Sequence, residues 1–345
     1  MRRVFNALIA PVLAFALPQM AAAQDCQPSS HTVQPGETVF TIANHYFGDA
    51  EKWTLIYYSN EELLKSAVFQ VSPGDDLVIP CVAGQRKADA TPLLQDNAEM
   101  KLVTGSNYAP FTDRDWPGDG MVTELVNAAL ETTPNPVSYS VTWEDDWSKH
   151  LFPMLDSKQF DMGFPWLKPD CASTPNNERC KNFHFSDPLV EVLILLFVRE
   201  GSGITYEQDA DVIGKTLCRP EGYFTHDLDR PGREWLKKGL IKLVQADSPK
   251  ACFQELLAGR VDAVTLNVFL GATTIDDMGL RGAVVPLDKP LSVEGLHVVI
   301  SKKHWRGTTH LYRFNAGLAA LKKSDRYAQI VSKHLGEFWD QLKTQ

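Results

Sequence analysis

The side chains best suited to bind a small ligand are an arginine in a polar loop and several aromatic residues. Arg179 ends a segment that reads Ser-Thr-Pro-Asn-Asn-Glu-Arg at residues 173–179. A guanidinium group can hold a carboxylate through two parallel charge-assisted hydrogen bonds, so Arg179 is our first candidate for an anchor. The alternative is an ordinary surface arginine in a loop.

Aromatic residues could form the apolar walls that a ligand cleft needs around its few polar anchors. Tyr108, Phe111 and Trp166 are candidates for such a wall, and packing in the core is the rival interpretation. Trp116 is followed by Pro and Gly, which mark an exposed loop, and we expect it at the cleft.

Catalytic motifs are missing from the sequence. It contains no His-Glu-x-x-His, Gly-x-Ser-x-Gly or Cys-x-x-Cys motif and no glycine loop that would cradle a phosphate. Its nine histidines are scattered along the chain. We therefore predict a protein that binds rather than catalyses, with no metal and no other cofactor.

The N-terminus has the three parts of a secretory signal peptide at residues 1–23. Arg2 and Arg3 precede an apolar run that ends before Pro18, and three alanines follow at 21–23. The run is short for a membrane helix, so we expect cleavage after Ala23 and a soluble periplasmic protein. The formal charge of −9 becomes −11 without the two arginines, which argues against nucleic acid as a partner.

Six cysteines in an exported chain indicate disulfide bonds. Their positions fall into pairs that are close in sequence, and we predict the bridges Cys26–Cys81, Cys171–Cys180 and Cys218–Cys252. A polar, small-residue linker at 82–98 divides the mature chain into a short N-terminal part and a longer C-terminal part.

The N-terminal part, residues 26–81, shows a short strand, two helical stripes and a closing strand, which predicts a βααβ module. Its segments 33–39, 47–49 and 73–80, which read VQPGETV, FGD and PGDDLVIP, resemble a LysM module. LysM modules hold N-acetylglucosamine-containing glycans, including peptidoglycan, in a shallow groove between two loops. By that resemblance, Gly36, Glu37, Thr38 and Val39 on one side and Val71, Ser72 and Pro73 on the other line the groove, although such residues also serve simply as turn formers.

From residue 99 onward, strand patterns at 100–104, 137–143 and 160–166 alternate with helical stretches at 121–130 and 147–155, which predicts an α/β fold. The segments YAPF at 108–111, Asp161, ER at 178–179, FSDP at 185–188 and LAGRVDAV at 257–264 follow in the order of another family. They resemble the extracytoplasmic solute-binding proteins of family 3, the amino-acid ABC transporter type.

That resemblance implies a two-lobed, Venus-flytrap domain at 99–341. Lobe 1 would comprise about 99–196 and 297–341, lobe 2 about 197–296, and two extended crossings would form a hinge that closes on the ligand. Arg179 would grip a ligand carboxylate. Tyr223 and Thr225 would lie where the family places a helix N-terminus facing the ligand, although a plain cap at Thr225 is an equal alternative.

Asn267 departs from the family pattern, because amino-acid binders commonly have an aspartate near this point to pair with the ligand's ammonium group. A carboxylate-bearing or hydroxylated solute remains open, as does an ammonium group held by Asp170, Asp187 or other carboxylates. We expect a monomer that captures such a solute for an ABC transporter permease while the LysM module holds it at peptidoglycan. The alternatives are a ligand-free or sensory cell-wall interaction protein and a dehydratase-type enzyme on the same fold.

Overall fold

The computed structural model of the protein describes residues 28–47, 52–66, 71–81, 94–95, 98–133 and 136–344. The predicted signal peptide at 1–23, Cys26 and the greater part of the predicted linker at 82–98 lie outside these residues. In the part of the chain that is described, no helix is both long and apolar enough to cross a membrane.

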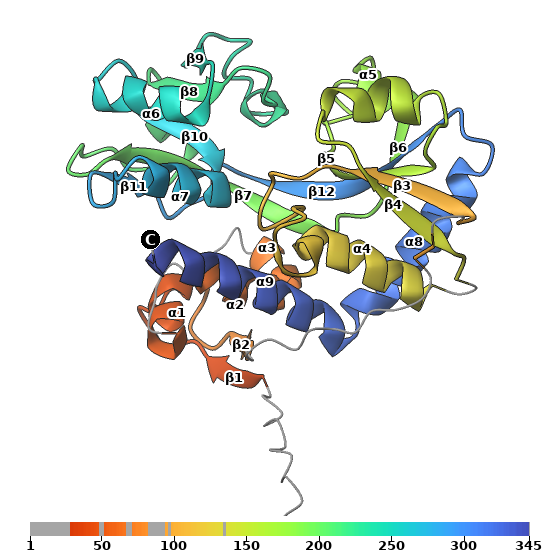
Figure 1. Ribbon diagram of the computed structural model, residues 1–345. Coiled ribbons are helices and arrows are strands. Elements are labelled where there is room, and N and C mark those ends of the chain that lie inside the picture. The colour runs from red at the N-terminus through yellow and green to blue at the C-terminus, as the bar shows by residue number, and fades with distance from the viewer. Residues whose placement is uncertain are drawn as a thin grey trace, which may run out of the picture.

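One mixed sheet of ten strands runs through the C-terminal part of the protein (Figure 1). Its main path is β4 (Tyr139–Trp143), β3 (Met100–Thr104), β5 (Met162–Leu167), β12 (Ser292–Ser301), β7 (Val190–Arg199), β10 (Ala263–Asn267), β8 (Thr216–Pro220) and β9 (Lys242–Ala246). Two short strands lie off this path, β6 (Phe183–Phe185) beside β12 and β11 (Val284–Pro286) beside β7. The predicted α/β class is confirmed.

The long strands β7 and β12 join two groups of parallel strands. Strands β4, β3 and β5 are parallel to one another, as are β10, β8 and β9, whereas β7 and β12 pair with each other in antiparallel register. We call β3, β4 and β5 with their helices the first lobe, and β8, β9 and β10 with theirs the second lobe. Strand β7 is buried along its first nine residues, as expected for a Val- and Leu-rich strand covered on both faces.

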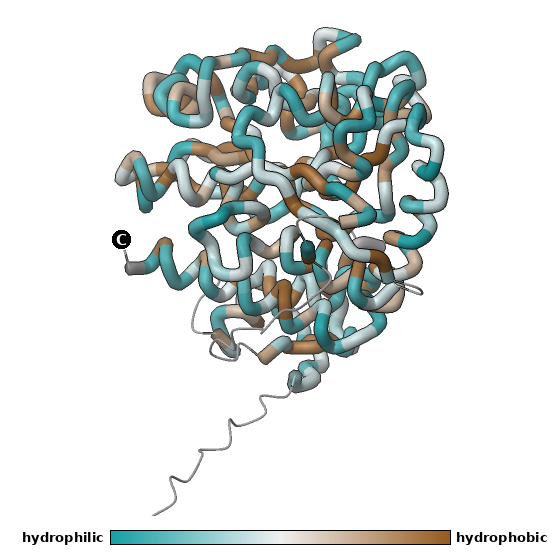
Figure 2. Tube along the Cα trace, turned by 45° about the vertical axis from the view of Figure 1, so that its right-hand side comes forward, coloured by the Kyte–Doolittle hydropathy of each residue, from teal (hydrophilic) through white to brown (hydrophobic). Residues whose placement is uncertain are grey.

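Helices cover both groups of strands. The first lobe carries α4 (Met121–Thr132), α5 (Glu178–Asn182), α8 (Gly307–Lys322) and α9 (Asp325–Thr344), and the second carries α6 (Pro249–Leu257) and α7 (Val268–Asp277). Figure 2 shows brown, hydrophobic segments interspersed with teal and white ones along the chain. The helix predicted at 147–155 is instead a π-helical turn, His150–Leu155, because Pro153 and an extended Phe152 interrupt the α-helical pattern.

The N-terminal part folds as β1 (Ser29–Thr32), α1 (Val39–Phe47), α2 (Trp53–Ser59), α3 (Glu61–Ser66) and β2 (Asp76–Ile79). Strands β1 and β2 pair in antiparallel register from Ser29 opposite Ile79 to Thr32 opposite Asp76. The predicted order of strands and helices is present, with a third short helix, α3, that the sequence pattern did not indicate.

This N-terminal module packs against the C-terminal helix. The indole Nε1 of Trp339 on α9 donates a 3.0 Å hydrogen bond to Thr54 Oγ1, and Lys52 forms a 2.8 Å ion pair with Asp340. All residues of α2 from 53 to 58 are buried, and a helix that is apolar on every side needs partners on every side. Helix α9 is one of these partners of α2, as Figure 1 shows.

Two of the predicted disulfides are present. Cys171 and Cys180 are bonded in the first lobe, and Cys218 and Cys252 join β8 to α6 in the second. Each pair has a Cα–Cα distance of 5.5 Å, within the usual range for a disulfide. The bridge Cys26–Cys81 remains a prediction, since Cys26 is not described.

Candidate functional site

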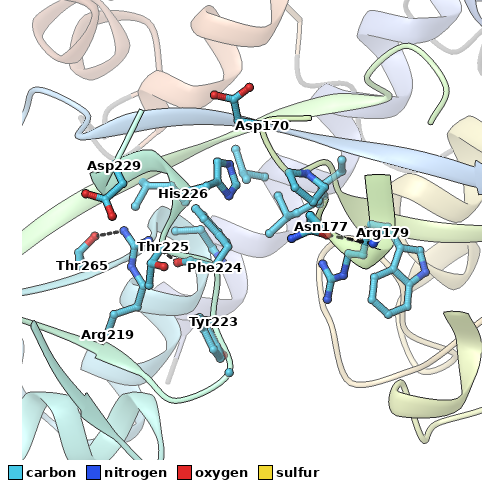
Figure 3. A pocket seen from close by; sticks show the side chains of 18 of the residues that line it. Asp170, Asn177, Arg179, Arg219, Tyr223, Phe224, Thr225, His226, Asp229 and Thr265 are labelled. Atoms are coloured by element: carbon cyan, nitrogen blue, oxygen red, sulfur yellow. Dashed lines mark hydrogen bonds between the residues drawn. The ribbon is translucent and has the colours of Figure 1, made fainter. Parts of the chain in front are cut away.

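A cavity of about 670 Å³ lies between the two lobes. The first lobe contributes the end of β5 and the loop at 169–179, and the second contributes residues 219–229 and 265–270. Val192 and Ile194 of β7 and Leu296 of β12 close the back. Figure 3 shows Arg179 and Asn177 on one side of this space and Tyr223, Thr225 and His226 on the other.

Alternation along β7 gives its two faces different neighbours, because successive side chains of a strand point to opposite faces. Val192 and Ile194 face the cavity. Glu191, the residue before Val192, accepts a 3.2 Å hydrogen bond from the hydroxyl of Tyr57 in the N-terminal module. The cavity and the module therefore lie on opposite faces of one strand.

Arg179 is held in place through its backbone. Its N–H donates a 2.9 Å bond to the side chain of Asn177, which caps α5, and its neighbour Cys180 is fixed by the disulfide to Cys171. The carbonyl of Cys180 also accepts a 2.7 Å bond from Lys302 Nζ. These contacts leave the side chain of Arg179 directed into the cavity.

The guanidinium of Arg179 lies over the ring of Trp166, 5.1 Å from the ring centroid, and forms no ion pair with any carboxylate among the described residues. Burial lowers the pKa of Arg179, since a charge loses solvation there. A half-buried cation without an acidic partner is a strong attractor for an anion, because a ligand carboxylate would replace the lost hydration.

Aromatic side chains contribute neutral donors to the same cavity. Burial raises the pKa of Tyr108 and of Tyr223, so both phenols keep their protons at neutral pH. The indole Nε1 of Trp166 is buried and has no hydrogen-bond partner within the described part of the chain. A polar ligand could accept hydrogen bonds from the two phenols.

Arg219, a cavity residue that the sequence analysis missed, is already neutralised. Its guanidinium forms two hydrogen bonds with the Asp227 carboxylate, at 2.6 and 2.9 Å, and one of 2.9 Å with Thr265 Oγ1. Burial raises the pKa of Asp227, but the hydrogen bonds and charge of Arg219 outweigh this and hold it below its usual range. Arg219 therefore serves as a buried brace of the second lobe.

His226 and Asp229 are further polar lining residues that the sequence did not reveal as site residues. Asp170, a predicted candidate for holding an ammonium group, also lines the cavity, whereas Asp187, the other candidate, does not. His226 Nε2 lies 3.1 Å from the carboxylate of Glu294 on β12, which connects the second lobe to the hinge. Hydrogen bonds from Ser173 hold the pKa of Asp170 below its usual range, so this carboxylate is ionised beside the cavity. No local motif marks these residues; only the fold assembles them.

Two of the three predicted second-lobe residues, Asn267 and Thr225, lie in the cavity wall with limited roles. Asn267 Oδ1 accepts a 2.9 Å bond from Leu270 N and so caps helix α7. Thr225 precedes a three-residue 3₁₀ turn, His226–Leu228, and makes no capping bond through its side chain. The predicted helix N-terminus facing the ligand is thus only a short turn.

Phe111 and Trp116 do not line the cavity, contrary to prediction. Phe111 is fully buried and packs edge-on against Phe269 of α7, with ring centroids 5.1 Å apart. Trp116 donates a 3.0 Å bond to His334 on α9 and packs near Phe338. The loop that carries both residues folds toward α9, and this leaves Tyr108, Trp166, Arg179, Tyr223, Thr225 and Asn267 as the predicted residues that line it.

The two loops predicted to bind glycan lie side by side in the N-terminal module. The backbones beside them are hydrogen-bonded, with Gly74 N donating to Val33 O at 2.9 Å and Val33 N donating to Asp75 O at 2.8 Å. Gly36, Thr38, Ser72 and Pro73 are exposed, Glu37 and Val71 are half-buried, and Val39 is buried in the core. The Glu37 carboxylate accepts from Gln34 N and contacts His31, and these bonds lower its pKa.

The architecture and the cavity define a two-lobed solute-binding protein. The sequence matches the bacterial extracellular solute-binding proteins, family 3, over residues 100–337, and the chain belongs to this family. It is 20% identical over 264 residues to a protein of Neisseria gonorrhoeae described as a "Probable histidine-binding protein", covering 76% of this chain and 92% of the relative.

A solved structure shares the fold. A histidine kinase sensor domain with similarity to periplasmic binding proteins superimposes with a TM-score of 0.51 at 23% identity, covering 70% of this chain and 98% of the other. A mutant arginine-binding protein of T. maritima gives a TM-score of 0.49 at 24% identity, covering 69% and 95%.

Proposed function

We propose that this protein captures a small polar solute with a carboxylate group, of the amino-acid type, in the cavity between its lobes. The observation that supports this most directly is the guanidinium of Arg179, which faces the cavity without a carboxylate partner among the described residues. A ligand carboxylate would fit its fork, while the Trp166 ring beneath it keeps the guanidinium in place.

A cationic group on the same solute would find carboxylates at the cavity. Asp170 from the first lobe and Asp229 from the second both line it. Asp170 also accepts hydrogen bonds from the amides of Ala172 and Ser173, and Asp229 from those of Leu236 and Lys237. Asn267 cannot supply a charge, so an ammonium group would be held at Asp170 or Asp229 rather than at the usual position of the family.

Solute capture would close the two lobes. In this proposal, residues 99–196 with 297–341 move against 197–296, and β7 and β12 absorb the rotation. The closed form would deliver the solute to the permease of an ABC transporter, as the family relationship suggests. The protein would act as a periplasmic monomer after cleavage of the signal peptide at 1–23.

The N-terminal module would hold the protein at peptidoglycan as a LysM-type domain. Its support is the sequence resemblance together with the adjacent, mostly exposed loops at 36–38 and 71–73. The predicted bridge Cys26–Cys81 would tie the two ends of this module, and 82–98 would link it to the solute-binding part.

A second candidate is a cell-wall sensor or interaction protein without transport. The contact between Tyr57 of the module and Glu191 of β7 favours it, because a sensor must connect its input and output parts. Transport requires solute binding to the full protein, whereas a ligand-free interaction protein would show none. A dehydratase-type activity would appear as turnover of the bound solute.

A thermal-shift screen of the full mature protein against amino acids, polyamines, organic acids and sugars tests the proposal. A ligand at 100 times its dissociation constant adds about 2.7 kcal/mol to stability, which gives a clear shift. We expect hits among carboxylate-bearing solutes. Hits confined to sugars or polyamines would contradict the role of Arg179, and silence throughout would favour the interaction protein.

A further inference from the structure

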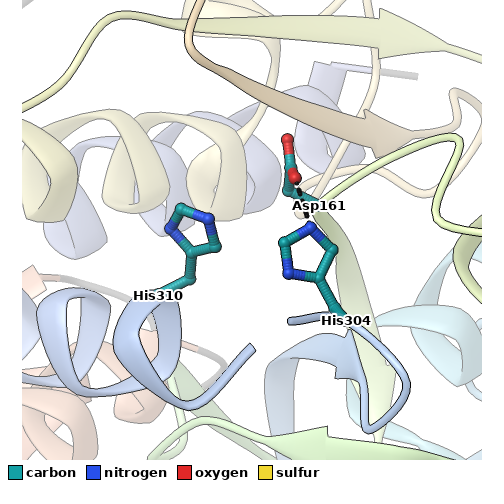
Figure 4. Close-up of side chains that lie close together, drawn as sticks. All are labelled: Asp161, His304 and His310. Atoms are coloured by element: carbon teal, nitrogen blue, oxygen red, sulfur yellow. Dashed lines mark ion pairs between the residues drawn. The ribbon is translucent and has the colours of Figure 1, made fainter. Parts of the chain in front are cut away.

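A cluster of two histidines and one aspartate lies in the first lobe, away from the cavity. Asp161 immediately precedes β5, His304 lies in the turn after β12, and His310 is on α8. One ligand-type atom of each residue lies within 4.8 Å of the others. Figure 4 shows the three side chains pointing toward one another from separate elements.

His310 differs from the other buried histidines. His150, His297 and His334 each make at least one hydrogen bond through a ring nitrogen. His310 is 2% exposed, and its Nδ1 is buried without a partner among the described residues. Its ring packs near the ring of His304, with centroids 5.4 Å apart, and Figure 4 shows one ring nitrogen turned toward His304 and Asp161. The nitrogen that faces the pair is Nε2, and it too forms no hydrogen bond with another described residue, so His310 offers an uncommitted ligand atom to His304 and Asp161.

From this geometry we infer that Asp161, His304 and His310 bind a divalent transition metal ion of the Zn²⁺ type. Two imidazoles and one carboxylate are ligands that Zn²⁺ prefers, while Ca²⁺ and Mg²⁺ require oxygen donors. A fourth, open position would hold water.

Small movements would convert the cluster into a coordination site. His304 Nε2 and Asp161 Oδ1 are 2.7 Å apart, whereas ligand atoms of a tetrahedral zinc site are about 3.4 Å apart. These two atoms would separate slightly while His310 approaches. His304 Nδ1 accepts a 3.1 Å bond from Arg306 N, so metal binding would move the ring proton to Nδ1 and release that amide to water.

A hydrogen bond from the backbone already orients the carboxylate of Asp161. Asp161 Oδ2 accepts a 2.6 Å bond from Lys101 N at the start of β3, which fixes the side chain beside His304. The positive charge of Arg306 nearby is balanced by Glu99, 3.1 Å away. A bound ion would connect β5, the end of β12 and α8, and so would stiffen the first lobe.

Titration of the full mature protein, stripped with a chelator, tests the inference. We expect one equivalent of Zn²⁺ to bind, Tm to rise by about 5 °C at saturation, and Co²⁺ to give the visible absorption of a tetrahedral site. His310→Phe keeps the volume of the ring and removes the ligand, and it should weaken binding at least about 100-fold.

Two further variants make the outcome decisive. His304→Gln keeps a hydrogen-bonding side chain beside Asp161 and should also abolish the Co²⁺ absorption. If His310→Phe does not fold, His304→Gln is the variant that tests the site. His45→Gln, at an exposed site on α1, should leave the stoichiometry unchanged. Failure of the wild type to bind Zn²⁺, or binding that survives both His304→Gln and His310→Phe, would overturn the assignment.

Discussion

The phenolic hydroxyl of Tyr57 in the N-terminal module donates a hydrogen bond of 3.2 Å to the carboxylate of Glu191 on hinge strand β7. Both side chains are buried, and the next residue along the strand, Val192, lines the cavity. The module therefore contacts the outer face of the strand that would bend in the proposed closure of the lobes.

Tyr57→Phe should lower the free energy of unfolding by about 1–3 kcal/mol, because a buried carboxylate loses a donor. Chemical denaturation with a signal that covers the whole chain measures this change. The matched control is Tyr46→Phe, which removes an exposed hydroxyl 3.0 Å from His31 and should cost less than about 0.5 kcal/mol. A loss in Tyr57→Phe below about 0.5 kcal/mol would show that this contact adds little stability.

Arg179→Ala should weaken binding of a carboxylate-bearing solute by about 2–5 kcal/mol, as measured by calorimetry. Arg179→Lys keeps the charge but loses the planar fork, so we expect affinity between those of wild type and Arg179→Ala. An affinity unchanged by Arg179→Ala would remove Arg179 from the site.

Asn267→Asp should fold normally, because Asp caps a helix as well as Asn does. The new carboxylate would face the cavity and should strengthen binding of α-amino acids relative to the corresponding acids that lack an ammonium group. Asn267→Ser serves as a control, since it keeps the cap without adding charge. Competition binding with matched pairs of ligands gives the ratio, and an unchanged ratio would place the ammonium elsewhere.

Stability should fall in mild acid because of His297. Burial lowers its pKa from 6.5 to about 4, so the folded state holds this ring neutral while the unfolded chain takes up a proton. Above about pH 6.5 the ring is neutral in both states and costs no stability. As the pH falls from about 6.5 toward 4, the free energy of unfolding falls by about 1.4 kcal/mol per pH unit.

Removing the titrating ring tests this origin of the acid sensitivity. His297→Asn retains a donor for the carbonyl of Ser186, which the ring now contacts at 2.7 Å, and should flatten the stability profile between pH 6.5 and 4. His45→Asn, at an exposed position on α1, should leave the slope as it is. A slope that persists in His297→Asn would assign it to other groups.

Removing each of the two described disulfides should affect stability and solute affinity to different extents. Replacing Cys218 and Cys252 with serine opens a loop of 34 residues and should cost about 4 kcal/mol, with little change in affinity. Replacing Cys171 and Cys180 opens a loop of 9 residues and should cost about 2.5 kcal/mol, yet weaken solute binding more, because Arg179 adjoins Cys180. The reverse order of affinities would show that the Arg179 loop needs no brace.

Elements with strong local patterns could be predicted from the sequence. The strand at 100–104 has the predicted bounds. The helix predicted at 121–130 begins where predicted and ends two residues later, at Thr132. Both have a continuous apolar pattern of the appropriate period. The predicted helix at 147–155 was wrong because Pro153 breaks the hydrogen-bond pattern from within.

The site could be predicted only in part, because only some of its residues stand in segments with a local sequence signal. Arg179 and Trp166 stand in segments whose sequence marks them, and both line the cavity. Arg219 lies on β8 and His226 begins a short 3₁₀ turn after it, and no local motif marks either residue. Glu294 reaches His226 only through the return of β12. Docking of the N-terminal module had one local signal, the all-round apolar character of α2.

The aliphatic back of the cavity gives a solute a direction. Val192, Ile194 and Leu296 offer no hydrogen bond from their side chains, whereas Arg179 lies on the first-lobe side. A carboxylate at Arg179 would leave the remainder of the solute to extend along the hinge strands. The distance between the guanidinium and this aliphatic surface would then act as a ruler, so that affinity rises with each added methylene until the chain meets the hinge and falls beyond that length.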